Sequence, residues 1–178
     1  MPLVVLLKGV NVGRQRRFRP TVLARDLKHL ELVNVGSTGA FVALGSTSRE
    51  QLREAISKKL PFQAEIFICR GREVTSLLSR SHDFFAAHPA RPDVVRFVSV
   101  LSRAPRDEPE LPVRLPSNGE WLVQVVAVRG RFVVGLYRRR MKTIGELRKL
   151  EKVFGVSHTT RSWSTMSAIG RVLEGSER

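Results

Sequence analysis

Apolar residues of the first half fall into short unbroken runs separated by segments with a helical repeat. Residues 2–7 form a continuous Val- and Leu-rich run, which is typical of a strand buried on both faces. A helix is predicted to begin at Pro20, because proline favours the first helical turn and Leu23, Leu27 and Leu30 follow on one face. Further strands are expected at residues 33–35, 40–44 and 65–69.

A second helix of this half is marked by a cap. Thr47 and Glu50 have capping-box spacing, and the apolar positions that follow repeat with a helical period up to Pro61. The two strands at residues 33–35 and 40–44 are joined through glycines, as in a hairpin. The predicted order is therefore strand, helix, strand, strand, helix, strand.

The second half repeats this pattern approximately. Strands are predicted at residues 94–101, 121–128, 132–137 and 156–160, with a hairpin that turns at Arg129 and Gly130. Thr143 and Glu146 indicate the start of a helix that ends at Gly155, and a C-terminal helix closes the chain. Residues 103–119 contain four prolines, so this segment is expected to be an irregular loop where a helix would otherwise lie.

Both halves thus show the split βαβ, or ferredoxin-like, order. We expect an α+β protein in which two ferredoxin-like halves with antiparallel sheets pack as one structural unit. The first half is predicted to span residues 1–80, a connector residues 81–93, and the second half with the C-terminal helix residues 94–178.

The net charge of the chain indicates which classes of partner it can bind. Thirty-one Lys and Arg face 16 Asp and Glu, a formal net charge of +15, which favours encounter with nucleic acid or another polyanion. Arg supplies 24 of the 31 basic residues, a bias that a GC-rich genome also produces without any functional demand.

The cysteine content and the first apolar run of the chain bear on its cellular compartment. The single Cys69 forms no internal disulfide, which suits a reducing compartment. The opening apolar run is too short for a signal peptide or a membrane span. We therefore expect a cytoplasmic protein that does not bind membranes. The sequence leaves the oligomeric state open, and a monomer is favoured.

The densest basic run lies between the hairpin and the next predicted helix, and a second basic cluster follows the first strand. If the two clusters converge, they would form a groove able to contact several phosphates. The sequence leaves that convergence open. The candidate anion-binding residues are Arg138, Arg139, Arg140 and Lys142 in the first cluster and Arg14 and Arg16 in the second.

The ends of the chain supply further candidates. Lys8 and Asn11 follow the first strand, while Thr160 and Arg161 end the last predicted strand. If the halves pack together, these four side chains would share one cleft wall and bind an anion there. The alternative is a structural role in which Arg161 bonds backbone carbonyls. Trp163 is a candidate for stacking on a ligand or for packing.

Signals for an enzyme are weak. No nucleophile-elbow, zinc-protease or paired-cysteine motif occurs, so no metal site and no cofactor are expected, and the catalytic residues of any reaction remain unknown. Residues 9–13 follow a strand but lack the glycine spacing of known phosphate-binding loops. Residues 39–43 overlap part of an RRM signature, but its basic residue and two of its aromatic residues are missing.

Two end segments carry a family resemblance. Residues 6–13, LLKGVNVG, resemble the "LLRGINVGG" opening of the bacterial domain of unknown function 1697 family, and residues 159–163, TTRSW, are similar to its closing "TTRNW". The resemblance spans residues 3–173 and implies two ferredoxin-like halves in an α+β body, without implying an activity. The chain departs from the family pattern at Arg14 and Ala40.

Together these observations predict a non-catalytic protein that binds anions or the phosphates of nucleic acid through Arg and Lys. One alternative is an enzyme of unknown reaction that acts on a small acidic substrate in a cleft between the halves. The other is a protein-interaction module.

Overall fold

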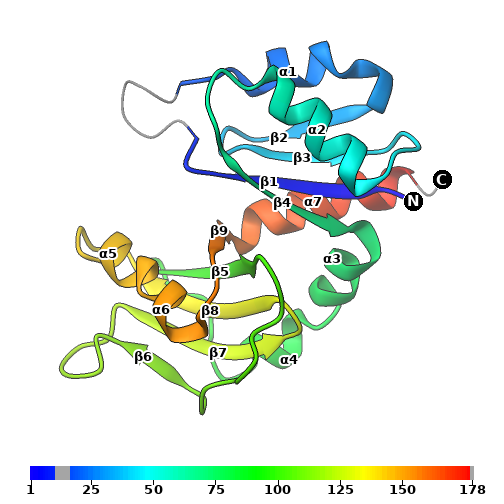
Figure 1. Cartoon of the computed structure of the whole chain (residues 1–178). Coiled ribbons are helices and arrows are strands. Elements are labelled where there is room, and N and C mark those ends of the chain that lie inside the picture. Colours follow the sequence, from blue (N-terminus) through cyan, green and yellow to red (C-terminus); the bar gives the residue numbers. More distant parts are fainter. Residues whose placement is uncertain (11–16, 177–178) are drawn as a thin grey trace. The chain divides into compact units, whose positions relative to one another are not determined.

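The computed structural model describes residues 1–10 and 17–176 and divides into two compact units. Unit 1 comprises Met1–Leu78 and Ser167–Arg178, and unit 2 comprises Ser79–Met166. Each unit contains one antiparallel sheet, of four strands in unit 1 and five in unit 2 (Figure 1). The predicted α+β class with two antiparallel sheets is confirmed.

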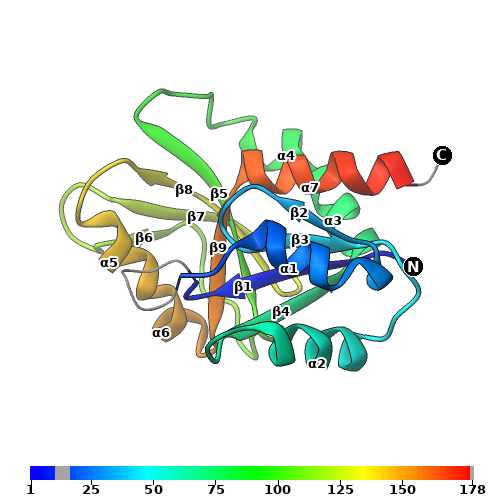
Figure 2. The same cartoon turned by 90° about the horizontal axis from the view of Figure 1, so that it is seen from above.

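Unit 1 has the ferredoxin-like strand order β2-β3-β1-β4, and every neighbouring pair is antiparallel. Its first two helices lie on one face of the sheet (Figure 1, Figure 2). The elements are β1 (Leu3–Lys8), α1 (Pro20–Asp26), a 3-10 turn (Lys28–Leu30), β2 (Leu32–Val35), β3 (Ala40–Ala43), α2 (Arg49–Lys59), β4 (Glu65–Arg70) and α3 (Gly71–Leu78).

The core of unit 1 forms between the helices and the alternate residues of the strands. Val5 and Phe41 from the sheet pack in one cluster with Leu52 and Ile56 of α2, and all four are fully buried. The alternation follows from the two-residue period of a strand, which sends every second side chain to the same face. The apolar run at residues 2–7 therefore does form a buried central strand, as predicted.

The cap of α2 lies one residue later than predicted. The Ser48 side chain accepts a hydrogen bond from the backbone N–H of Gln51 at 3.1 Å, and the Gln51 side chain accepts from the Ser48 backbone at 3.0 Å. The proposed Thr47–Glu50 pair was therefore wrong, although the capping-box mechanism was right.

Unit 2 has the strand order β6-β7-β8-β5-β9, in which the last four strands reproduce the order of unit 1. The place of a first helix is taken by a long segment that contains only the short edge strand β6, close to the loop predicted there. The elements are α4 (Ser81–Phe85), β5 (Val94–Leu101), β6 (Val113–Leu115), β7 (Val123–Arg129), β8 (Phe132–Arg138), α5 (Thr143–Arg148), α6 (Leu150–Phe154), β9 (His158–Ser162) and α7 (Trp163–Ser176), the last of which continues into unit 1.

Several local predictions in unit 2 need correction. A short helix, α4, occupies part of the predicted connector, and the single helix expected before Gly155 is divided into α5 and α6. The Thr143 side chain does not cap α5; its hydroxyl donates instead to the Arg138 carbonyl. Gly155 does end α6 in the left-handed conformation, with φ of 67°, and Gly130 turns the hairpin with φ of 57°.

The core of unit 2 lies between α5, α6 and one face of its sheet. Phe97, Val125 and Val133 from three strands pack in one cluster with Leu150 and Phe154 of α6. Strand β9 lies at an edge of the sheet and is composed of polar residues. Because successive side chains of a strand point to opposite faces, β9 places polar groups on both. Within the described ranges, no helix is both long enough and apolar enough to cross a membrane.

Candidate functional site

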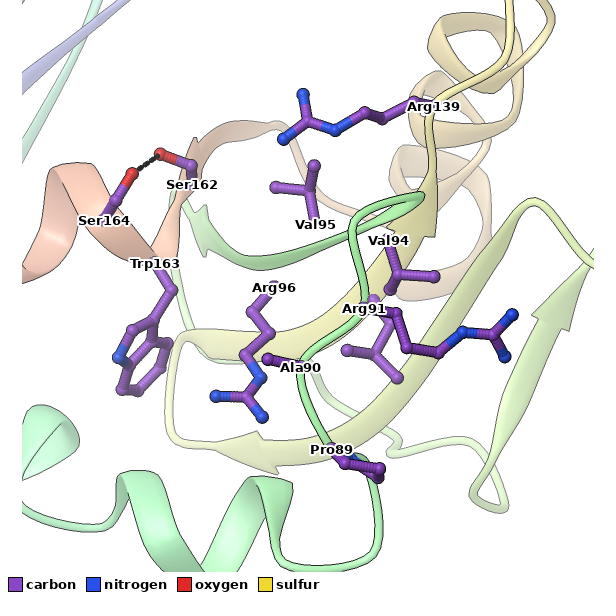
Figure 3. A pocket seen from close by; sticks show the side chains of 11 residues that line it. Pro89, Ala90, Arg91, Val94, Val95, Arg96, Arg139, Ser162, Trp163 and Ser164 are labelled. Carbon is purple, nitrogen blue, oxygen red and sulfur yellow. Dashed lines mark hydrogen bonds between the residues drawn. The ribbon is translucent and has the colours of Figure 1, made fainter.

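Unit 2 contains an open pocket of about 300 Å³ (Figure 3). Its walls come from the segment after α4, the first residues of β5, the end of β8 and the junction of β9 with α7. The lining residues are Pro89, Ala90, Arg91, Val94, Val95, Arg96, Leu136, Arg139, Ser162, Trp163 and Ser164.

An aromatic cluster fixes one wall of this pocket. The Trp163 ring meets the Phe85 ring edge-on, with centroids 5.0 Å apart, and the Phe84 ring at 6.2 Å. Phe84 and Phe85 are buried, whereas Trp163 is half-buried and lines the pocket. The packing alternative stated for Trp163 agrees with these ring contacts, and its stacking on a ligand stays a prediction.

Arg96 is held in place by two contacts. Its guanidinium lies over the Phe85 ring, 4.6 Å from the centroid, and its Nη2 donates to the His88 carbonyl at 2.8 Å. Its Nε–H is buried and has no acceptor among the residues that the structure describes. Because Arg96 lines the pocket and these two contacts hold its guanidinium in place, it adds a positive charge in a fixed position to the wall.

The opposite edge of the pocket carries hydroxyl groups at the start of α7. The Ser162 hydroxyl accepts from the backbone N–H of Thr165 at 3.2 Å and lies 2.9 Å from the Ser164 hydroxyl. Ser162 therefore caps a helix of 14 residues. The partial positive charge of the helix start adds to the cationic side chains beside it.

Two further arginines border the pocket with different surroundings. Arg91 is 3.3 Å from Asp93, so a carboxylate partly compensates its charge. Arg139 is exposed, has no ion pair within the described ranges, and extends toward the side on which Ser162 and Ser164 lie (Figure 3). Arg139 is therefore the cation of this pocket that is most available to an anion.

The predicted basic run separates into residues with different roles. Arg138 is tied down: its side chain is only 16% exposed, its Nε donates to the Trp121 carbonyl at 2.9 Å, and its guanidinium lies 4.2 Å from the centre of the Trp121 ring. Arg138 also lies near Glu120, at 3.2 Å. Arg139 lines the pocket, and Arg140 and Lys142 are exposed outside it.

Thr160 and Arg161 have structural partners within the sheet. The Thr160 hydroxyl lies 2.6 Å from the Ser99 hydroxyl on β5. Arg161 is buried, and its Nη1 donates to the Thr159 hydroxyl at 2.7 Å and to the Thr160 carbonyl at 2.9 Å. Burial lowers the pKa of the Arg161 guanidinium to about 10. The structural alternative stated for Arg161 therefore agrees with its contacts.

The remaining predicted residues lie elsewhere. Lys8 belongs to unit 1, where its ammonium is 3.8 Å from Glu65. Because Lys8 and Arg161 belong to different units, the shared cleft stays a prediction. Asn11, Arg14 and Arg16 lie outside the described residues.

Most residues that line the pocket were not predicted from the sequence; Arg139 and Trp163 were. Arg96 did give a signal, because it interrupts an otherwise apolar strand run, but its place beside Trp163 depends on the pairing of β5 with β9. Ser162 and Ser164 gave no signal of their own. Within the described part of the chain, no group of three or more His, Cys, Asp and Glu side chains could hold a metal ion.

Comparison with solved structures shows a similarity of fold. The chain superimposes on the conserved bacterial protein SP0830 from Streptococcus pneumoniae with a TM-score of 0.60 and 16% sequence identity, covering 97% of this chain and 98% of that one. At this identity the similarity shows the fold alone. No family model matches the sequence, and no curated protein matches it either.

Proposed function

We propose that this protein binds phosphate groups of a polyanion, nucleic acid being the first candidate, through the pocket of unit 2. The observation that carries the proposal is the composition of the lining: three arginines and two serines, with no carboxylate among them. Guanidinium and hydroxyl groups are the side chains that most often bind phosphate oxygens. We also infer, from the two end motifs and the fold, that the chain is related to the domain of unknown function 1697 family.

The electrostatics around the pocket support this proposal. Unit 2 contains 16 Lys and Arg against eight Asp and Glu, a formal net charge of +8. Arg140 and Lys142 are exposed close in sequence to Arg139, so a chain of phosphates could continue beyond the pocket. A free phosphate would use the pocket alone, whereas a polyanion would also contact these neighbours.

The lining favours binding over catalysis. None of the residues that line the pocket is His, Asp, Glu, Cys or Lys, so the walls offer no ordinary general base. A serine nucleophile needs such a base within hydrogen-bond reach. Ser162 instead caps α7, which is a structural use of its hydroxyl.

Fluorescence anisotropy of a labelled oligonucleotide tests the proposal, with titrations at about 50 mM and about 200 mM salt. The parent is expected to bind more weakly at the higher salt. Arg139→Ala should weaken binding and lower the salt slope by about one unit, because one phosphate contact is lost. Arg72→Ala is the matched control. Arg72 is exposed on α3 in unit 1, and its substitution removes the same charge as Arg139→Ala.

Two results would contradict the proposal. The parent could fail to bind at low salt, which removes the polyanion as a ligand. Alternatively, Arg139→Ala and Arg72→Ala could weaken binding equally, which would mean that net charge matters and the pocket does not.

A further inference from the structure

We propose that the pocket of unit 2 accepts one unpaired nucleotide, with its base against Trp163 and its phosphate near Arg139, so that the protein prefers single-stranded over double-stranded nucleic acid. This inference rests on the proposed function and specifies its ligand. It requires the pocket to have one part that fits a base and another that fits a phosphate. The lining contains both an apolar part and a part with arginine and serine side chains.

The apolar part of the lining is larger than a phosphate site needs. Trp163 and Val95 form this wall together with Pro89, Ala90, Val94 and Leu136. A phosphate group gains nothing from such surface, whereas a base gains by burying its flat faces against aromatic and aliphatic side chains. The volume of about 300 Å³ limits the ligand to roughly one nucleotide.

Arg96 supplies a specific polar contact within the apolar part. Its contacts with Phe85 and the His88 carbonyl fix the guanidinium plane, and Arg96 lines the pocket. A base carries ring nitrogens and carbonyl oxygens that can accept hydrogen bonds from the terminal N–H groups of a guanidinium. Since the guanidinium is already oriented by Phe85, little conformational entropy is lost when the base binds.

The groups that we propose for the phosphate are Arg139, Ser162 and Ser164, and their side chains lie away from the Trp163 ring. Arg139 extends toward Ser162 and Ser164 at the start of α7 (Figure 3). A nucleotide whose base contacts Trp163 would therefore leave its phosphate among a guanidinium, two hydroxyl groups and the positive end of a helix.

A duplex cannot use the pocket in this manner. Its bases are paired and stacked, and turning one outward requires energy that a single strand does not need. The phosphates of both forms can still contact Arg139, Arg140 and Lys142. We therefore expect single strands to bind more tightly, with a difference that comes from the base.

Intrinsic fluorescence tests this directly, because the chain has two tryptophans and Trp121 can be replaced. In a Trp121→Phe background, Trp163 is the only indole reporter, and a cooperative thermal unfolding transition is the control for the folding of this variant. A single-stranded oligonucleotide is expected to quench Trp163, whereas a duplex of the same length should quench it little. A nucleoside monophosphate serves as a third ligand and should quench at higher concentration.

The second measurement uses a variant in which a larger side chain fills part of the pocket. Ala90→Leu adds bulk to the lining without changing any charge, and Ala104→Leu places the same side chain on an exposed loop outside the pocket. Ala90→Leu should reduce single-strand affinity about tenfold, the size of one base-stacking contact, and leave duplex affinity unchanged. Ala104→Leu should change neither.

The outcomes separate this inference from the proposed function. Equal affinity for single strand and duplex, with no quenching of Trp163, would overturn the inference and leave phosphate binding intact. Quenching by the monophosphate alone, without quenching by the oligonucleotide, would also overturn it. A parent that binds neither nucleic acid would contradict both proposals.

Discussion

The hydroxyl groups of Ser99 and Thr160 lie 2.6 Å apart across the pairing of β5 with β9, although 61 residues separate them in the chain. Ser99 is fully buried. The Thr160 hydroxyl is also 3.4 Å from Nδ1 of His158, a buried residue of the same strand. Thr160 was predicted as an anion ligand, but these contacts give its hydroxyl a partner within the sheet.

We therefore expect Thr160→Val to lower stability and to leave polyanion affinity unchanged. The variant keeps the shape of the side chain but leaves the Ser99 hydroxyl without this partner, a loss of about 1–3 kcal/mol in the free energy of unfolding. Urea unfolding measures it. In the double variant with Ser99→Ala, the loss should be smaller than the sum of the single losses, because both changes remove the same contact. Weaker oligonucleotide binding at unchanged stability would restore the ligand role.

Arg161 predicts a stability difference that depends on pH. Burial lowers the pKa of its guanidinium to about 10, below the ordinary value that applies in the unfolded chain. At pH values between these two, the unfolded chain holds a proton that the folded chain has released, so the free energy of unfolding rises with pH. Below this window both states are charged and the contribution is constant.

Arg161→Ala lacks this titration. It should be less stable than the parent near neutral pH, by about 1–3 kcal/mol, because the Thr159 hydroxyl and the Thr160 carbonyl lose their donor. The difference in unfolding free energy should stay constant up to about pH 9 and widen above about pH 10. Burial also raises the pKa of Tyr137, but this group is present in both proteins and cancels. A difference that stays flat or narrows in alkali would contradict the prediction.

The neighbours Arg138 and Arg140 should respond differently to the same substitution. Arg138→Ala removes a hydrogen bond to the Trp121 carbonyl and the contact with its ring, so the free energy of unfolding should fall by about 1–3 kcal/mol. Arg140 is exposed, so Arg140→Ala should stay within about 0.5 kcal/mol of the parent. Urea denaturation of the two variants at one pH measures both changes. Equal losses would mean that the Trp121 contacts contribute nothing to folding.

Binding measurements should not distinguish Arg138→Ala from Arg140→Ala. Both variants lose one positive charge, so both should bind a polyanion slightly more weakly through the long-range field. Under the proposed function, neither should lower affinity as much as Arg139→Ala, because Arg139 lines the pocket and the other two do not.

The sequence by itself determined the order of the strands and main helices of unit 1 and the hairpin of unit 2. The unbroken apolar run at residues 2–7 identified a central strand, because a strand buried on both faces has no polar alternation. The glycine turn at Gly130 placed a hairpin correctly, since that turn needs a positive φ. These signals are local, and local patterns suffice where backbone conformation and burial follow from neighbouring residues.

Only the tertiary structure decided which basic residues are available. Arg138, Arg139 and Arg140 are adjacent and chemically identical, yet the first is held by Trp121, the second borders a pocket and the third is exposed. Successive residues at the end of a strand point in different directions, so each meets different partners from distant segments. The pocket itself joins residues about 75 positions apart, from Pro89 to Ser164. Its existence depends on the pairing of β5 with β9, which are not joined by a turn, so no local pattern encodes that pairing.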